Sequence, residues 1–586
     1  MNFTDLININ PLLSSLFGLG VLIWNYLFSY KISLKFYFIK NKTLNFVFFN
    51  ILFYLIITPI LLLLLLFQVE MLFIRVFLYL IILFQLYYFF LERRIKLNTF
   101  HFFNKFDYFI IFILILFTFP QITDADSLDY HLGSVLDIIR NGSLQIRNDD
   151  WYHYRLIGLG EMINFYGLFF FSINFGQIFQ VLVFSNIILI FKIFSKNFKV
   201  NYLILFSFPL FASIMLSAKH ILIVSNCYLL VFSIFLLKLN KSIKLTFILL
   251  ILIIAPLGFK HSYLIYSLPI WFFLLLRYEV NMISFFQKSL FIFIFIPAVV
   301  FIKNIYHYGD PITPFLEFVK TNPNLDVISF AKELRYSTKV FTFFEFSFIP
   351  FFHFIPTNFN QISLLVSPIV LSFYLIFFKI KDKAIIGLLF TVYILLCFSG
   401  KSLSRFYLDL YFLCILFLLN NFNTFKIKKY FNYFLLTLIP YTLLSTFIIM
   451  YSIISLTYPI LNKENFKKSM NDKAHNYEIT NWLNYEINSK DKVLYDSTIR
   501  SKSYQNHKFN YYNINSKSIN EIQKIIESNG IDRIVLNETK FNLIFHSFYK
   551  CNINNKKMLN LATRNPINSK KNIDNILILD TKCIRW

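Results

Sequence analysis

The chain consists largely of long apolar runs separated by short polar loops. The runs at 45–67, 71–90, 285–302 and 430–456 are continuous and do not alternate between apolar and polar positions. A helix needs about 20 apolar residues to cross a hydrocarbon core, and lipid offers no partner for the backbone amides of an open strand. Continuous runs of this length therefore predict membrane-spanning helices.

The positions of lysine and arginine predict the side of each loop, because basic residues favour the cytoplasmic side. The first predicted span, at about 12–30, is followed by four lysines between 31 and 42. Two further spans precede a basic segment at 93–105, and a fourth span at 107–120 then runs outward. The loop 121–160 is therefore expected outside the cell membrane.

The stretch 161–194 allows two interpretations: one span preceded by a surface helix, or two short spans. One crossing keeps the later lysine and arginine clusters inside, whereas two crossings would move them all outside. We therefore predict one span at about 176–194, with 161–174 packed along the membrane surface. The chain then has about 14 spans, with both termini outside.

Three parts follow from this reading. Residues 1–106 are predicted to form extra N-terminal transmembrane helices. Residues 107–460 are predicted to form the main membrane core, with external loops at 121–160 and 303–361. Residues 461–586 are polar and rich in lysine and asparagine, which indicates an external tail.

Within the tail, short apolar runs predict strands at 492–495, 533–536 and 576–579. An amphipathic pattern at 518–528, ended by Asn529-Gly530, predicts a helix. The predicted fold class is an all-α polytopic membrane protein with a small C-terminal α/β extracytoplasmic module.

Composition and charge agree with this class. The 586 residues are 57% hydrophobic, whereas soluble domains have about 45–50% apolar residues. The net charge of +25 would suggest nucleic acid in a soluble protein, but these charges lie mostly in loops between apolar runs. Topology is the simpler explanation, and no nucleic-acid partner is expected.

The cysteines do not predict a metal site. Cys227, Cys397 and Cys414 lie in apolar runs and are expected to be buried. Cys551 and Cys583 lie in the tail and are free to pair if the tail is exported, although their spacing does not decide it. No CxxC pair or Cys/His cluster indicates zinc.

The strongest chemical cluster follows the fourth predicted span. The segment 123–132 carries Asp124, Asp126, Asp129, Tyr130 and His131. Ionisable groups beside hydrocarbon are costly, which favours a functional role. A positioned carboxylate can accept a proton from a hydroxyl, and arginine can bind phosphate oxygens in pairs. Carboxylates can alternatively bind Mg²⁺ or Mn²⁺, although the sequence requires no cofactor and assigns no metal ligand.

A structural interpretation of the same acids is equally compatible with their spacing. A helix is predicted at 127–140, and either Asp124 or Asp126 would be a suitable N-cap for it.

A resemblance favours the functional interpretation. The run Asp126-Ser127-Leu128-Asp129-Tyr130-His131-Leu132, followed by Asn141-Gly142-Ser143, resembles a signature of bacterial GT-C membrane glycosyltransferases, relatives of the protein O-mannosyltransferase and aminoarabinose transferase group. The resemblance extends over roughly 107–420. It includes a Gly-Asp-Pro turn at 309–314 and Arg405-Phe406-Tyr407 before a late span.

The resemblance implies a GT-C-like fold and an inverting glycosyl transfer at the outer face of the inner (plasma) membrane. A polyprenyl-phosphate-linked sugar would be the donor, and a lipid-linked glycan or an exported protein would be the acceptor. Asp126, or after it Asp124, would be the catalytic base. We expect substrate-binding roles for a wider set of residues: Asp129, Tyr130, His131, Arg140, Glu161, Lys219, Lys260, His261, Arg405 and Tyr407.

Two other functions remain as alternatives. The lysines and arginines at span ends also have a purely structural interpretation, in which they contact lipid head groups. A lipid-glycan flippase or transporter would carry charges inside its spans, and here such charges are few. An O-antigen polymerase or ligase would be expected to carry its key external loop late in the chain, whereas the acidic loop here comes early.

Overall fold

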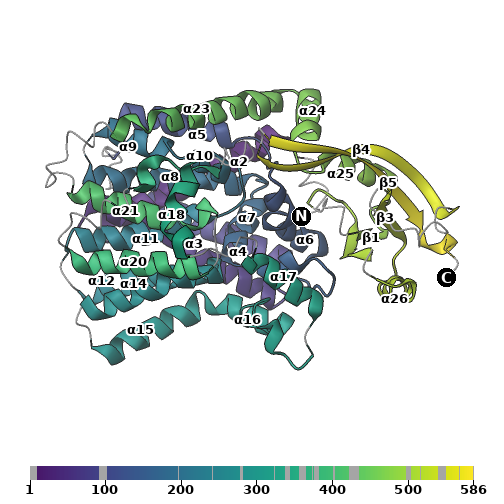
Figure 1. Cartoon of the computed structure of the whole chain (residues 1–586), viewed down its shortest axis with the longest axis horizontal. Helices are drawn as coiled ribbons and strands as arrows, with labels where there is room; N and C mark the ends of the chain where they lie inside the picture. Colours follow the sequence, from purple (N-terminus) through teal and green to yellow (C-terminus); the bar gives the residue numbers. More distant parts are fainter. Residues whose placement is uncertain are drawn as a thin grey trace.

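The protein is described here from a computed structural model of the chain. The structure describes residues 9–91, 102–195, 197–239, 242–277, 281–322, 324–336, 343–355, 364–371, 374, 382–399, 403–421, 434–496, 503–514, 517–538, 550–565 and 568–584. Their helices lie alongside one another in one body, and a small sheet lies at one end of that body (Figure 1).

The N-terminal helices begin where an asparagine satisfies a first-turn amide. Asn10, Asn41 and Asn104 accept backbone hydrogen bonds at the start of α2 (Pro11–Lys35), α3 (Lys42–Leu66) and α5 (Lys105–Thr118). Such caps stabilise a helix by about 1 kcal/mol. The caps separate consecutive apolar runs into distinct helices.

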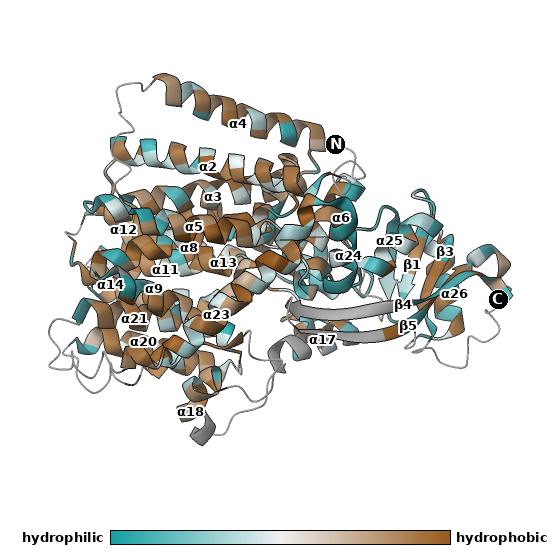
Figure 2. Ribbon diagram, turned by 90° about the horizontal axis from the view of Figure 1, so that it is seen from above, coloured by the Kyte–Doolittle hydropathy of each residue, from teal (hydrophilic) through white to brown (hydrophobic). Residues whose placement is uncertain are grey.

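Five helices in the described ranges are long and apolar enough to cross a membrane, and a bent pair adds a sixth candidate. These are α2, α3, α4 (Met71–Leu91), α8 (Phe175–Phe194) and Phe434–Leu461, together with the pair α15 (Met282–Phe295) and α16 (Ala298–Tyr308), which bends by 55°. Their apolar surfaces are evident in Figure 2, where α4 lies at the edge of the body. A mainly helical chain with apolar, span-length helices was predicted and is observed.

The remaining apolar helices are shorter than a typical span. They are α11 (Ile221–Leu236), α12 and α13 (Ile243–Ile254 and Pro256–Phe259), α20 (Lys383–Phe398) and α21 (Leu408–Asn421). At 1.5 Å per residue they extend about 20–25 Å, less than a hydrocarbon core of about 30 Å. Helix length alone therefore does not decide the predicted total of about 14 spans.

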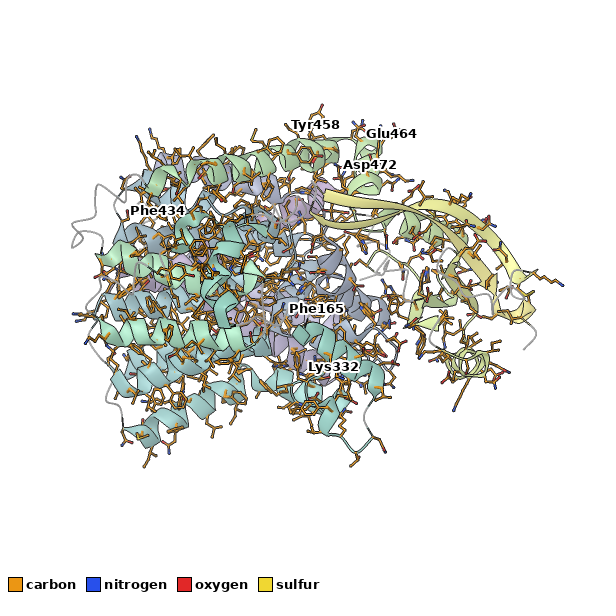
Figure 3. The ribbon with its side chains drawn as sticks, viewed as in Figure 1. Phe165, Lys332, Phe434, Tyr458, Glu464 and Asp472 are labelled. Atoms are coloured by element: carbon orange, nitrogen blue, oxygen red, sulfur yellow. A yellow bond between two sulfur atoms is a disulfide. The ribbon has the colours of Figure 1, made fainter. Side chains whose placement is uncertain are left out.

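The segment predicted to lie on the membrane surface is deeply buried. Helix α7 (Leu159–Phe169) has no exposed residue, and it packs against α3, α8 and α6 (Gly133–Asn141). Phe165 of α7 lies inside the helical body (Figure 3). The helix predicted at 161–174 is therefore present as α7 and is covered by other helices, whereas its place along the membrane surface stays a prediction. The predicted span at 176–194 coincides with α8.

Further helices complete the body and its outer loop. They are α9 (Phe198–Phe206), α10 (Pro209–Met215), α14 (Leu264–Arg277), α17 (Leu325–Tyr336), α18 (Phe343–Phe354), α23 (Ile439–Ser452), α24 (Lys463–Lys473) and α25 (Tyr477–Glu486).

The tail forms a five-stranded sheet in the order β2-β1-β3-β5-β4. The three predicted strands correspond to β1 (Lys492–Asp496), β3 (Arg533–Asn537) and part of β5 (Asn568–Asp580). Strands β2 (Lys508–Tyr512) and β4 (Asn552–Asn565) were not predicted, because their asparagine- and lysine-rich sequences lack clear alternation.

The predicted tail helix is α26 (Ile519–Asn529). Ser518 and Glu521 form a capping box at its start, and Gly530 adopts a positive φ of 60° at its end. A disulfide joins Cys551 and Cys583, the pairing that the sequence left open.

The two faces of the sheet have different partners. Val493 and Tyr495 of β1 belong to the same apolar core as the helical body, whereas Leu494 belongs to a second core with Ile522 of α26. Alternate residues of a strand point to opposite faces. One face of the sheet therefore packs toward the body, and α26 covers the other.

Candidate functional site

The acidic segment forms a tight turn at the tip of the helical body. Beyond α5 the chain enters a single π-helical turn, Ser127–His131, and then α6. The Leu132 amide donates to the Ser127 carbonyl over 2.8 Å. Such π turns occur often at functional sites. We call residues 123–132 the acid turn.

Asp124 has a structural role in this turn. Its Oδ2 accepts hydrogen bonds from the Ser127 amide at 3.0 Å and the Ser127 hydroxyl at 2.7 Å. The same oxygen lies 3.3 Å from Lys219 Nζ. Asp124 is buried. The helix-start interpretation therefore holds for Asp124, which leaves Asp126 as the better candidate base.

Asp126 makes no capping bond and faces two cations. Its Oδ2 accepts from Lys219 Nζ at 2.9 Å and lies 3.5 Å from an Arg405 guanidinium nitrogen. The Asp126 side chain is 48% exposed. Lys219 first, and Arg405 after it, hold the pKa of the Asp126 carboxyl well below its usual range, against the effect of burial.

A cavity opens beside this ion cluster. Its wall contains three cations and four hydroxyl groups together with an acid and apolar side chains: Tyr130, Lys219, Ile221, Lys260, Ser262, Tyr263, Ile265, Tyr266, Leu396, Arg405, Phe406 and Asp409. Its free volume of about 50 Å³ has room for a few water molecules. Asp126, Lys260 and Arg405, which lie far apart in the sequence, thus meet at one place.

The three cations share a structural context. Lys219 lies two residues before α11, Lys260 precedes the short turn that leads into α14, and Arg405 lies three residues before α21. Each therefore lies near a helix N-terminus, where unpaired amides and the helix dipole favour anions. Burial, and then the charge of Arg405, lower the pKa of Lys260 to about 8. The site as a whole suits an anion such as phosphate.

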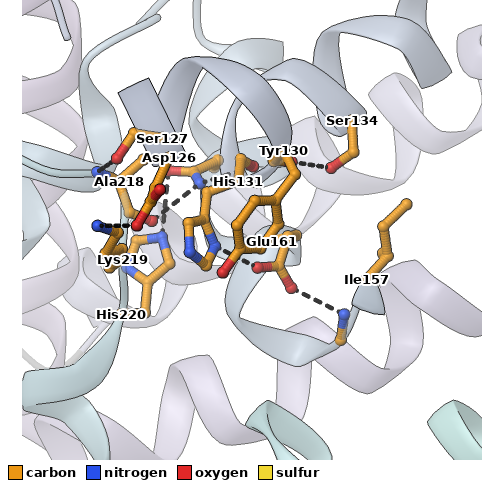
Figure 4. Close-up of polar contacts among 12 residues, drawn as sticks. Asp126, Ser127, Tyr130, His131, Ser134, Ile157, Glu161, Ala218, Lys219 and His220 are labelled. Carbon is orange, nitrogen blue, oxygen red and sulfur yellow. Dashed lines mark hydrogen bonds and ion pairs between the residues drawn. The ribbon is translucent and has the colours of Figure 1, made fainter. Parts of the chain in front are cut away.

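His131 of the acid turn and Glu161 of α7 form a buried pair. His131 Nδ1 lies 2.6 Å from Glu161 Oε1, and the Gly158 amide donates to Glu161 Oε2 over 2.8 Å (Figure 4). Burial lowers the pKa of His131 to about 4. Burial raises the pKa of Glu161, but the hydrogen bond and charge of His131, the Gly158 amide and the charge of Lys260 together lower it. Glu161 therefore positions His131, and neither side chain lines the cavity.

Several predicted site residues lie elsewhere. Arg140 donates to Asp137 and to the carbonyls of Gln505 and Ser503, so it joins the loop to the module. The prediction that Arg140 binds substrate is not supported by this position.

The other outlying residues are also accounted for. His261 contacts Asn304 at 3.3 Å. Tyr407 is fully buried, with its hydroxyl 3.9 Å from Cys397 Sγ. Neither lines the cavity, because each side chain points into helix packing. Asp129 lies 3.8 Å from His153, at the rim of the turn.

Four polar residues of the cavity wall were not predicted: Ser262, Tyr263, Tyr266 and Asp409. Asp409 follows Arg405 by one helical turn and accepts a hydrogen bond from Ser225 of α11. Tyr263 ends the short 3-10 turn His261–Tyr263, and Tyr266 lies in the first turn of α14. The sequence marks Asp409 as an acid inside an apolar helix, and the spacing of four from Arg405 was the available signal.

Within the described residues, no group of three or more His, Cys, Asp or Glu side chains is placed to hold a metal ion. The cavity wall is instead rich in basic side chains. This donor set favours direct binding of an anion by lysine and arginine.

Comparison with known proteins adds no family assignment. No protein-family model matches the chain, and a search of curated proteins finds no match.

Proposed function

We propose that the chain is a membrane glycosyltransferase of the GT-C kind. It moves a sugar from a polyprenyl-phosphate donor to a lipid-linked glycan or an exported protein. The observation that carries the proposal is the contact of half-exposed Asp126 with Lys219 and Arg405, beside a cavity that also contains Lys260. One carboxylate at a cluster of phosphate-binding cations is what transfer from a phosphate leaving group needs.

The donor phosphate would bind between Lys219, Lys260 and Arg405. Arginine binds phosphate oxygens through its planar fork, and each lysine contributes a point charge. The three helix N-termini add positive potential. Because the cavity has room for only a few water molecules, donor binding is expected to widen it.

Donor binding would also activate the base. In the free chain the two cations make Asp126 a weak base. A bound phosphate shares those cations, so the pKa of Asp126 rises toward its ordinary value. Asp126 then accepts the proton of the acceptor hydroxyl as that oxygen attacks the anomeric carbon. The bond from this carbon to the phosphate oxygen breaks, the phosphate leaves with the electron pair, and the configuration inverts.

The proposed location is the outer face of the inner membrane, with about 14 spans in all. The acid turn and the tail contact one another, so they belong on the same side: the His475 amide donates to the Thr123 carbonyl over 3.2 Å. The Cys551–Cys583 disulfide supports an exported tail, because disulfides persist in oxidising compartments.

The test is Asp126→Asn, with Asp472→Asn at an exposed position of α24 as a matched change. Cells that make the native donor and acceptor would carry each variant in place of the wild-type chain, and mass spectrometry of envelope glycans would measure sugar addition. We expect Asp126→Asn to lower transfer by about 10²–10⁴-fold at normal membrane abundance. Asp472→Asn should retain transfer. Normal transfer by Asp126→Asn would reject the proposal.

A further inference from the structure

Two residues of the C-terminal module contact the acid turn on either side of Asp126. The His475 amide donates to the Thr123 carbonyl, three residues before Asp126. The Ser503 hydroxyl donates to the Leu128 carbonyl, two residues after it. Ser503 is 3% exposed, so water cannot readily replace its hydroxyl. The backbone on both sides of Asp126 is thus held by a part of the chain about 350 residues away in sequence.

The contact at Leu128 lies where the turn is most tightly packed. A Cβ atom on Gly133 would be 2.5 Å from the Leu128 carbonyl oxygen and 3.1 Å from Ser503 Oγ. Both distances are shorter than ordinary van der Waals contact. The π turn, the module and the start of α6 therefore meet at one point, and only glycine fits at position 133.

The module is attached to the body independently of Ser503. Arg147 donates to the Phe509 carbonyl at 3.1 and 3.3 Å, and the Asp150 amide donates to the Tyr511 carbonyl at 2.8 Å. The Tyr511 amide in turn donates to Asp149 Oδ2 at 3.0 Å. Loss of the Ser503 hydroxyl should therefore leave the module in place and affect the acid turn.

We infer that the module is a positioning element of the site, in which Ser503 holds the acid turn so that Asp126 stays against Lys219 and Arg405. The expected effect of Ser503 on sugar transfer rests on the proposed function, whereas its effect on the position of Asp126 does not. Ser503 acts through the Leu128 carbonyl and is a positioning residue. A small displacement of a reacting group can lower a rate about 10²-fold.

The position of the turn can be measured without substrate. The purified full chain would carry Asp126→Cys, whose thiol is the accessible one: Cys227, Cys397 and Cys414 are buried and the other two cysteines are joined. An anionic and a cationic methanethiosulfonate would modify this thiol in parallel. The ratio of the two rates reports the local potential, which Lys219 and Arg405 make positive.

Ser503→Ala would then be added, with Ser528→Ala on the exposed face of α26 as a matched control. We expect Ser503→Ala to lower the ratio of anionic to cationic rates at least about threefold and the control to leave it unchanged. Limited proteolysis would establish that the module stays attached. In the chain with Asp126 intact, Ser503→Ala should lower the maximal transfer rate about 10–100-fold with little change in KM.

Gly133→Ala provides a second route to the same carbonyl from within the body. It should also lower the ratio of anionic to cationic rates. If Ser503→Ala releases the module, Gly133→Ala becomes the deciding variant. An unchanged ratio in a variant whose module remains attached overturns the inference. Because the ratio needs no transfer, a failure of Asp126→Asn to abolish transfer would reject the proposed function separately.

Discussion

We divide the loop 121–160 after Leu132 and call 121–132 its first half and 133–160 its second half. The two contain similar types of residue and have opposite structural roles. Both contain aspartates, basic or histidine side chains and aromatic rings. In the first half, Asp126 stays half-exposed and faces cations from distant helices. In the second half, Asp137, Arg147 and Asp149 are buried and bond to one another or to the module. The role of each charged residue depends on which other part of the chain packs over it. The composition of the loop does not show this.

The second half is a docking surface. The Arg147 guanidinium lies 4.9 Å from the Trp151 ring and 4.8 Å from the Phe509 ring, in cation–π geometry. Burial lowers the pKa of Arg147, but Asp137 and Asp149 outweigh this effect and raise it. The loop backbone at Asp150 also pairs with β2, the edge strand of the sheet. It thereby covers an edge that would otherwise be open to other chains.

The largest expected effect tests the docking half. Arg147→Ala removes the cation beside buried Asp149 and one of the two cations beside buried Asp137, and breaking a buried pair typically costs about 3–5 kcal/mol. We expect the module to detach, which limited proteolysis of the purified chain would measure. A module that stays protease-resistant in Arg147→Ala would show that this half of the loop is not what attaches it.

A smaller effect distinguishes the cations around Asp126 from the docking surface, by one arginine from each. Arg405→Gln should weaken binding of a polyprenyl phosphate about 10–100-fold, since a hydrogen bond to a charged group contributes about 1.5–3 kcal/mol. Arg140→Gln should leave this affinity unchanged and lower thermal stability instead, because Asp137 loses a bond of 2.9 Å. Calorimetry and thermal unfolding of the detergent-solubilised chain would measure both. Equal affinities for the two variants would contradict the assignment of Arg405.

The smallest expected effect is a pH dependence at Lys260. Burial and Arg405 lower the pKa of Lys260 to about 8, so the free chain carries this cation below that pH and loses it above. Affinity for an anion should therefore fall several-fold between about pH 7 and 9. A polyprenyl methyl phosphodiester is the suitable probe, because its own charge is constant over this range. Lys260→Arg should abolish the decline, and a decline that persists would assign it to another group.

The sequence predicted the parts of the fold that follow from local pattern. Apolar run length marked α2, α3, α4 and α8, and the Ser518…Gly530 signals bounded α26 within one residue. Pattern did not predict that other helices cover α7, because a short apolar helix has the same pattern whether it lies on a membrane or inside a bundle. It failed for β2 as well, whose pairing with β1 depends on a neighbour distant in sequence.

The candidate site divides in the same way. The acid turn, Lys219, Lys260 and Arg405 were marked by charge beside apolar runs, and the structure brings them together. Arg140 carried the same signal and belongs to the docking surface. An arginine lines a cavity or donates to a backbone carbonyl according to which distant segment packs against it. The local sequence around the arginine carries no such information.

The sequence by itself determined that this chain forms many apolar helices, an acid-rich turn after the fourth predicted span, and a polar tail. Run length and burial of apolar surface act locally along the chain. Only the tertiary structure decided which carboxylate is a cap and which faces cations, and that the tail lies against the turn. Those outcomes depend on contacts between residues up to 375 positions apart, such as Ser503 with Leu128.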